Sequence, residues 1–414
     1  MSGVSSVSDS TAVPVRFIAL MAAMSALDAF SIDGMLPALE IIGEELEVTV
    51  ANHRQYVVTA LFGGFSIGVL IYGFVADHIG RRKPVIAGFL IHLAGSALCC
   101  LAESYPVLLL GRVLQGLGAA GPYVLSLAIV RDNYKGRQMA RIMSLIMMIF
   151  IGVPMVAPFI GQGILLVAGW RSIFLVLGLF SLLVMVWFWC AQPETLKPED
   201  KVVLSFDAVW SSAVQVVTNR QSASYLLAIG AASGAFIAYL STAQQVFQNI
   251  YSLGTEFPVV FAALAGLLGI AAYFNSRWVE KLGMVRLVHL SLSGIVLISA
   301  AYVFCYLFLN VVPTLRFFLA YMVVVMFGFA LLFGNLSSLA LEPMGHIAGS
   351  AASLVNCIST LIAILFANLI GSQLQDNAMP VIVGFGALCA LAWVLNYQYL
   401  KPGARPDDSL TDLR

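Results

Sequence analysis

The sequence predicts an all-α membrane protein with twelve transmembrane helices in two pseudo-symmetric six-helix bundles. Hydrophobic residues make up 60% of the 414 residues and charged residues only 10%, whereas a soluble domain carries about 25% charged residues. The apolar residues form repeated stretches of about 20, the length that a helix needs to cross the hydrocarbon core of a bilayer. Related sequences also recur in the two halves of the chain.

Twelve apolar stretches predict the spans in order. Their expected ranges are 17–39, 55–75, 84–102, 107–130, 139–166, 171–190, 222–247, 257–279, 285–308, 315–340, 349–372 and 379–399. The longest polar interval separates the sixth span from the seventh and is rich in Pro, Glu and Lys. The expected domains are therefore a tail at 1–16, a bundle at 17–190, a linker at 191–221, a bundle at 222–400 and a tail at 401–414.

An internal repeat links the two halves. "GFVADHIGRRK", residues 73–83, follows the second span, and "AYFNSRWVEKLGMVR", residues 272–286, follows the end of the eighth. Alignment of Gly80 with Gly283 brings Asp77 opposite Glu280. Two related six-span bundles are typical of a transporter whose substrate site lies near the midplane between them.

The basic residues predict the orientation. If the N-terminus is cytoplasmic, seventeen of the 21 Lys and Arg residues fall on the cytoplasmic side, three on the other side, and Arg112 lies within the membrane. This asymmetry favours an even number of spans with both termini in the cytoplasm. A net charge of zero gives no reason to expect a nucleic-acid partner, and the six cysteines lack metal-ligand spacing, so we expect no metal and no cofactor.

The stretch "RVLQGLGAAGPYVLS", residues 112–126, contains G-x-G-x-x-G, a spacing that binds dinucleotides where a strand meets a helix. Here it lies within an apolar span, which excludes a pyrophosphate site. The glycines are therefore predicted to pack against neighbouring helices. The residues that share the opposite, polar helix face are Arg112, Gln115, Ala119, Tyr123 and Ser126.

Several motifs together resemble those of the major facilitator superfamily, and within it the bicyclomycin/chloramphenicol-resistance (Bcr/CflA) group of proton-coupled drug exporters. The loop "GFVADHIGRRK" is similar to the loop signature of the superfamily, with Gly73, Asp77, Gly80, Arg81 and Arg82 in place. "LLLGRVLQGLGAAGP" resembles its fourth-span signature, and "GVPMVAPFIGQGI" its antiporter signature, although Ala157 and Gln162 stand where glycine is common. "SIDGMLPALE", "GWRSIF" and "HIAGSAAS" are similar to the narrower group.

Ionisable residues within the spans are the candidates for coupling, because charges in a bilayer are costly and usually functional. Asp33 and Arg112 lie at similar depth, and the resemblance implies that their spans face one cavity, which predicts a direct or water-mediated pair. Asp33 is either the proton carrier or the structural partner of Arg112. Asp28 is either a second proton or cation site or a buried protonated acid, and it is a departure from the exporter group. His92 and His289 are predicted to be packing residues.

The resemblance also implies a gate. Asp77 is expected to face the positive N-terminal end of span eleven, near Gly349 and Ser350. Asp132 is expected to bind an arginine of the same loop. Pro154, Pro158 and Gly161 mark either the antiporter helix or an ordinary helix kink.

The remaining polar residues of the spans are expected to line the substrate cavity with aromatic and amide groups or to form ordinary interhelical hydrogen bonds. They are Gln115, Tyr123, Tyr239, Gln244, Gln245 and Asn335.

The predicted function is proton-coupled export of small amphipathic molecules or drugs across the bacterial inner membrane by alternating access. The alternative is an importer or exporter of a specific metabolite, such as a nucleoside, an amino acid or a siderophore, on the same scaffold. A membrane-embedded enzyme is disfavoured, because no nucleophile–base pair or metal motif has a recognisable spacing. The expected partners are the substrate, protons and the bilayer, and we expect a monomer.

Overall fold

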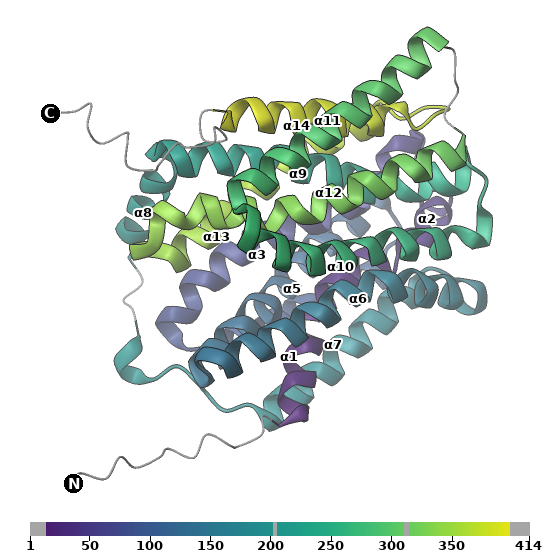
Figure 1. Ribbon diagram of the computed structural model, residues 1–414. Helices are drawn as coiled ribbons and strands as arrows, with labels where there is room; N and C mark the ends of the chain where they lie inside the picture. The colour runs from purple at the N-terminus through teal and green to yellow at the C-terminus, as the bar shows by residue number, and fades with distance from the viewer. Residues whose placement is uncertain (1–13, 202–204, 310–313, 398–414) are drawn as a thin grey trace, which may run out of the picture.

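The computed structural model describes residues 14–201, 205–309 and 314–397, and these residues form helices, turns and loops without a strand (Figure 1). Residues 1–13 of the first predicted tail, and all of the predicted tail 401–414, lie outside the described residues. Eleven stretches of the described chain are long and apolar enough to cross a membrane. The longest of them, Leu315–Ser372, contains two successive helices.

Twelve long helices therefore form the transmembrane part, as the sequence predicts. In the first half they are α1 (Val15–Asp33), α3 (Tyr56–Ile79), α4 (Arg82–Cys100), α5 (Tyr105–Asn133), α6 (Gly136–Ala168) and α7 (Arg171–Ala191). In the second half they are α9 (Arg220–Gln244), α10 (Phe257–Leu282), α11 (Met284–Leu309), α12 (Leu315–Leu341), α13 (Ala348–Ser372) and α14 (Met379–Asn396).

Short helical elements interrupt or connect these spans. They are η1 (Leu36–Ala38), α2 (Leu39–Glu45), η2 (Ala51–Gln55), η3 (Pro198–Asp200), α8 (Phe206–Thr218), the π-helix η4 (Gln245–Ile250), η5 (Gly254–Glu256) and η6 (Glu342–Ile347). Three of them differ from the sequence prediction. The first α-helix ends at Asp33, within the predicted span 17–39, because the chain turns into a 3₁₀ segment that contains Pro37, although the apolar stretch continues to Glu45. The seventh continues as a π-helix, and the expected linker contains a helix, α8.

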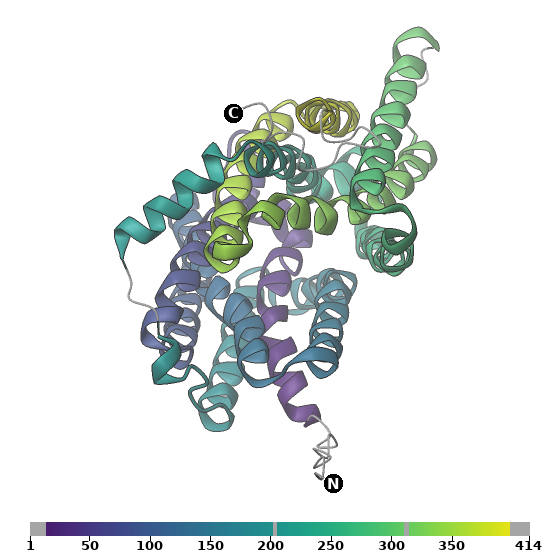
Figure 2. The same ribbon diagram turned by 60° about the vertical axis from the view of Figure 1, so that its left-hand side comes forward.

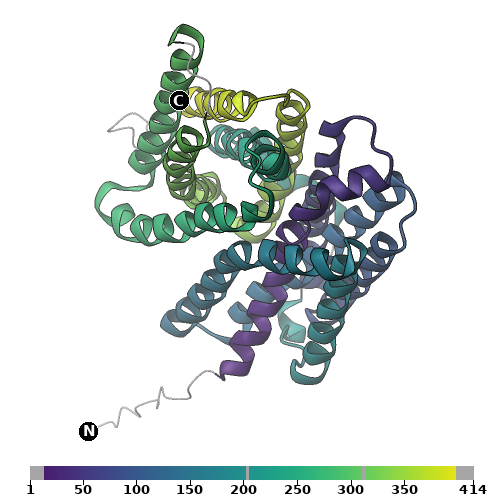
Figure 3. The ribbon, with the colours of Figure 1, turned by 90° about the vertical axis from the view of Figure 1, so that its right-hand side faces the viewer.

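The helices are arranged as two bundles, which lie side by side in Figures 2 and 3. The N-bundle consists of α1 and α3 to α7, and the C-bundle consists of α9 to α14. In the N-bundle α5 packs against both α3 and α4, and in the C-bundle α9 packs against α13 and α14. The two bundles meet where α3 contacts α13 and where α6 contacts α10.

Two sides of the molecule are distinguished below. The tail side is the side on which α1 begins and α14 ends, and the far side is the side that carries η1, α2 and η2. Loops 80–81, 134–135 and 192–201 lie on the tail side, and loops 101–104, 245–256 and 373–378 lie on the far side, because successive spans cross in opposite directions.

The glycines of the G-x-G-x-x-G stretch hold α5 close to its neighbours, as predicted. A Cβ added at Gly116 would lie 1.9 Å from the carbonyl oxygen of Leu61 on α3, and one at Gly118 would lie 2.3 Å from the backbone nitrogen of His92 on α4. Because neither helix can give way without a backbone shift, only glycine permits this approach. The helices α3, α4 and α5 thereby form a tight group that positions Arg112.

Candidate functional site

Two carboxylates on α1 are buried in the N-bundle. Asp28 is 4% exposed and Asp33 is 3% exposed. One buried oxygen of each, Oδ1, has no hydrogen-bond partner among the described residues. Buried polar groups are normally satisfied, and an unsatisfied carboxylate oxygen is costly unless the group is protonated or binds a ligand. Each therefore retains an open position for a proton or another donor.

Arg112 lies on α5 and is fully buried. Its guanidinium donates from Nε to the carbonyl oxygen of Val57 at 2.9 Å, from Nη2 to that of Ser31 at 2.9 Å, and from Nη1 to Oε1 of Gln115 at 2.8 Å. It also lies 5.8 Å from the ring of Phe174. These contacts hold a fixed positive charge between α1, α3 and α5.

The direct form of the expected Asp33–Arg112 pair is not present. The salt bridges of the described residues, defined by N···O distances up to 4.0 Å, do not include Arg112 with either aspartate. Arg112 instead contacts α1 through the carbonyl of Ser31, two residues before Asp33. Three acceptors, the carbonyls of Val57 and Ser31 and Oε1 of Gln115, already engage the planar guanidinium.

Arg112 belongs to a closed ring of buried hydrogen bonds. Gln115 accepts from Arg112 and donates from Nε2 to Oγ of Ser96 at 2.8 Å. His92 lies between two hydroxyls, with Nδ1 3.4 Å from Oγ of Ser96 and Nε2 3.1 Å from Oγ of Ser31. Ser31 closes the ring, because its carbonyl binds Arg112.

This ring changes the interpretation of two residues. Gln115, which is expected to line the substrate cavity, is 0% exposed in this structure and is hydrogen-bonded to Arg112 and Ser96. His92 is buried as predicted for a packing residue, but it also links α1 to α4 beside the charged group, which sequence reasoning missed. The one available signal was the i, i+4 spacing of His92 and Ser96 on α4.

The other expected cavity residues make separate contacts in the two bundles. Tyr239 is 3% exposed and its ring stacks on Phe261 at 6.2 Å. Asn335 is 4% exposed and donates to Oδ1 of Asn275 at 2.8 Å. The ring of Tyr123 lies 5.5 Å from those of both Phe65 and Phe150. Gln244 and Gln245 lie on the far side, where they join the two bundles.

Polar contacts close the far side of the molecule. Glu40 on α2 accepts from Nδ2 of Asn249 at 2.6 Å and from Nε2 of Gln244 at 3.3 Å. Asn52 donates to the carbonyls of Ser372 and Leu374 on the C-bundle at 2.9 and 2.8 Å, and it accepts from Gln245 at 3.1 Å. These hydrogen bonds join the two bundles on the far side, so the far side is closed in this state.

The tail-side loop that is expected to form the gate, called the gate loop below, belongs to a compact cluster of charges. Gly80 ends α3 with φ +104, a backbone angle that favours glycine. After this turn Arg81 binds Asp77 through Nη1 and Asp132 through Nε, the second at 3.0 Å. Arg82 donates to the carbonyl of Trp189 at 2.8 Å. The loop therefore ties α3 and α4 to the end of α5, and the structure brings together the arginine and Asp132 as expected.

Glu194, which follows α7, completes this cluster and was missed by sequence reasoning. Its carboxylate accepts from the backbone N–H groups of Arg81 and Arg82 at 2.8 and 3.1 Å, and from those of Thr195 and Leu196. Partial burial raises the pKa of the Glu194 carboxyl, but these four N–H donors outweigh that effect and hold the pKa below its ordinary value. The charge of Glu194 thus holds the gate loop to the start of the linker.

Asp77 does not make the expected contact with α13 in this state. Its side chain is 49% exposed and is paired with Arg81, and no hydrogen bond joins it to Gly349 or Ser350 in the described chain. The helices α3 and α13 still approach closely, since a Cβ at Gly73 would lie 2.4 Å from Oγ of Ser353. The Asp77 carboxylate is instead paired with the guanidinium of Arg81, four residues further along the chain.

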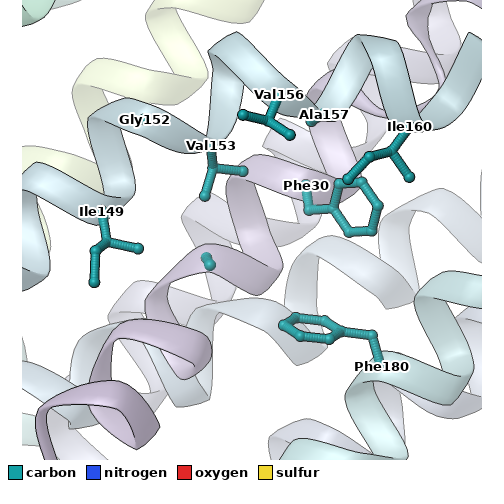
Figure 4. A pocket seen from close by; sticks show the side chains of 9 residues that line it. Phe30, Ile149, Gly152, Val153, Val156, Ala157, Ile160 and Phe180 are labelled. Atoms are coloured by element: carbon teal, nitrogen blue, oxygen red, sulfur yellow. The ribbon is translucent and has the colours of Figure 1, made fainter. Parts of the chain in front are cut away.

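The expected antiporter helix, α6, packs its Gly161 against the end of α1. A Cβ at Gly161 would lie 1.7 Å from the carbonyl oxygen of Gly34. Pro154 and Pro158 lie within a helix that continues through both of them. Beside this contact an apolar groove of about 530 Å³ opens between α1, α6 and α7, and Phe30 and Phe180 lie across it from the α6 residues (Figure 4).

Comparison with protein families and sequences gives concordant matches. A family model described as Major Facilitator Superfamily matches residues 18–368. An uncharacterized MFS-type transporter, YdgK of Bacillus subtilis, is 32% identical over 87% of this chain and 90% of its own. A bicyclomycin resistance protein homolog of Haemophilus influenzae is 27% identical over 93% and 96%, and a chloramphenicol resistance protein of Pseudomonas aeruginosa is 28% identical over 88% and 86%.

Solved structures show the same fold at low identity. The xylose transporter XylE from E. coli, in a partially occluded inward open conformation, matches with a TM-score of 0.71 at 14% identity over 94% of this chain and 98% of its own. The human organic anion transporter MFSD10 matches with a TM-score of 0.67 at 16% identity over 94% and 100%.

Proposed function

We propose that this chain, which belongs to the major facilitator superfamily, is a proton-coupled antiporter that exports small amphipathic molecules by alternating access. The names of its relatives support the substrate class, since two of them are bicyclomycin and chloramphenicol resistance proteins. The coupling is argued from the side chains of the N-bundle.

The observation that carries the coupling is the pair of buried acids on α1. Asp28 and Asp33 each keep an oxygen without a partner, while the nearby cation Arg112 is engaged by other acceptors. A carboxylate in this setting is stabilised either by a proton or by a bound cationic or hydrogen-bonding ligand. Competition between a proton and substrate for one site is the simplest basis for exchange, because occupancy by one excludes the other.

The fixed elements around these acids have supporting roles. Arg112 and its ring of hydrogen bonds hold α1, α4 and α5 in one body, and Gly161 lets α6 pack against the end of α1. Asp33 lies where α1 ends and η1 begins, next to the far-side contacts of α2. Protonation of Asp33 is therefore proposed to act on the segment that closes the far side.

The proposed location is the bacterial inner membrane with both termini in the cytoplasm. The basic residues of the described chain support this orientation, because Arg81, Arg82, Lys135 and Arg220 belong to the tail side. With the tail side cytoplasmic, the far side that the contacts of Glu40 and Asn52 close is the outer side. We further propose that the protein acts as a monomer and catalyses no covalent chemistry.

The test is transport in proteoliposomes with an imposed proton gradient. Asp33→Asn mimics the protonated acid permanently, so gradient-driven export should be lost while the variant still folds and binds substrate. Asp28→Asn, measured in parallel, shows which acid is required. Gradient-driven export by the Asp33→Asn variant at the wild-type rate would show that Asp33 does not carry the proton.

The same assay separates export of drugs from the alternative function, transport of one metabolite. A drug exporter accelerates the efflux of several unrelated amphipathic compounds, whereas a specific carrier responds to one nucleoside, amino acid or siderophore.

A further inference from the structure

The linker helix α8 (Phe206–Thr218) lies at the border of the membrane-spanning region. In Figure 2 it is the teal helix at the left-hand edge of the molecule, after the grey trace. A single residue separates its last residue from α9, and that residue, Asn219, caps α9 by accepting from the backbone N–H of Ser222 at 3.0 Å. Because α9 is a span, the end of α8 lies where that span enters the bilayer.

One side of α8 packs on the C-bundle. Val216 is 0% exposed and Ser212 is 6% exposed. Ser350, at the start of α13, donates to Oγ of Ser212 at 3.4 Å. His346 Nε2 lies 2.9 Å from Oε1 of Gln215. These contacts fix the rotation of α8 about its own axis, and so they decide which residues face outward.

The outward-facing part of α8 divides into an apolar strip and a polar strip. Trp210, Val214 and Val217 are 64%, 42% and 57% exposed. Their spacing of four and then three residues places them on one helix face. Asp207, Ser211 and Thr218 are also exposed and lie roughly 60–100° around the helix from Trp210. A helix whose free surface is half apolar and half polar fits a boundary between two solvents.

We propose that α8 is a membrane-surface helix, which inserts Trp210, Val214 and Val217 into the boundary between lipid headgroups and acyl chains on the tail side. The lipid surface is the occupant that the placement favours, since α9 and α13 both enter the bilayer directly beside this helix. Tryptophan is enriched at this depth, and an interfacial helix carries its apolar face inward and its polar face toward water. The inference depends on the position of the membrane-spanning helices and does not depend on which substrate the protein transports.

The consequence is a lipid contact on the connection between the two bundles. The helix α8 contacts the tail-side end of α13 through Ser212 and contacts η6, which precedes α13, through Gln215. The chain before α8 leads back to Glu194 and the gate loop. A change in the depth of α8 in the leaflet therefore acts on the tail-side end of α13, the helix that packs against α3.

The test measures depth at two neighbouring positions of α8 in the full chain. In a variant with the six cysteines replaced, Val214→Cys and Ser211→Cys are each labelled with a nitroxide and reconstituted in phosphatidylcholine–phosphatidylglycerol vesicles. Oxygen concentrates in the acyl region and a nickel chelate stays in water, so the label at position 214 should show several-fold less nickel relaxation than the label at 211. Ser211 is the matched control, because it is exposed and lies on the polar strip.

Equal nickel accessibility at positions 211 and 214 would overturn the proposal. Protection of position 214 that disappears when the vesicles hold one protein each would also overturn it, because a second copy would then be the occupant. Val217→Cys repeats the measurement on the same strip if the first variant does not fold, and it should show the same low nickel accessibility.

Discussion

Removal of the Glu40 carboxylate should open the far side of the protein. Glu40 joins α2 of the N-bundle to the C-bundle, where its carboxylate accepts from Asn249 at 2.6 Å and from Gln244 at 3.3 Å, and it lies 3.9 Å from Arg54. Glu40→Ala removes the acceptor of both inter-bundle hydrogen bonds. Glu44→Ala is the matched control, because Glu44 lies on the same helix and is exposed.

The magnitude follows from these contacts. A hydrogen bond to a charged group contributes about 1.5–3 kcal/mol when it is buried. The Asn249 contact is short but its pair is exposed, and the Gln244 contact is long, so the two together should contribute about 1.5 kcal/mol. Since about 1.4 kcal/mol corresponds to a tenfold change in an equilibrium constant, the open far-side population should rise about tenfold.

The assay is the distance distribution between spin labels at Val50→Cys and Thr255→Cys, two positions on opposite bundles of the far side. In the Glu40→Ala background a longer-distance population should appear, and in the Glu44→Ala background it should not. An unchanged distribution with Glu40→Ala would refute the assignment of these hydrogen bonds as the contacts that hold the far side closed.

Three further outcomes are expected. Gly161→Ala should destabilise the protein by roughly 1–3 kcal/mol, because the added Cβ would meet the backbone of Gly34. Gly163→Ala is the control, because a Cβ at that position meets open space. Equal melting temperatures of the two variants would contradict this prediction. Glu194→Gln should lower the free energy of unfolding by about 1 kcal/mol at neutral pH. Because the pKa of Glu194 is lowered in the folded state, this difference in stability should vanish as acid protonates the wild-type carboxylate. A difference that does not change with pH would exclude the charge as its cause. Arg112→Ala should lower stability by about 1–3 kcal/mol, because the buried acceptors of Arg112 lose their donor. Arg112→Lys should lower it by less, since lysine keeps the charge and three donors. A wild-type melting temperature for Arg112→Ala would show that these contacts are not needed.

Much of the candidate site was predictable from residue type and spacing. Because a charged side chain in a bilayer is energetically costly, the sequence identified Asp28, Asp33 and Arg112 as candidate coupling residues. All three are buried in the N-bundle. The gate loop was predictable as a cluster, and Arg81 binds Asp132 there. Its fifth charged member, Glu194, was not, because it lies 113 residues from Arg81 and no local pattern connects them.

Other assignments depended on which atoms meet across helices. Arg112 has a long side chain that reaches several acceptors from one backbone position, so its choice of Val57 and Ser31 over Asp33 is set by the packing of α1 and α3. The same packing brings Gln115 and His92 together in one hydrogen-bonded ring.

Composition and periodicity were sufficient to predict that the protein lies in a membrane, how many spans it has, that it consists of two related halves and that the glycines pack helices together. Each of these properties follows from the energy of placing a segment in lipid or of bringing two helices together. Only the three-dimensional structure showed which groups bind Arg112, that the far side is closed, where α8 lies, and that Asp77 pairs with Arg81 rather than with α13. These features depend on contacts between segments far apart in the chain, such as Glu40 with Asn249. Contacts of this kind change as the two bundles move, while the sequence stays the same.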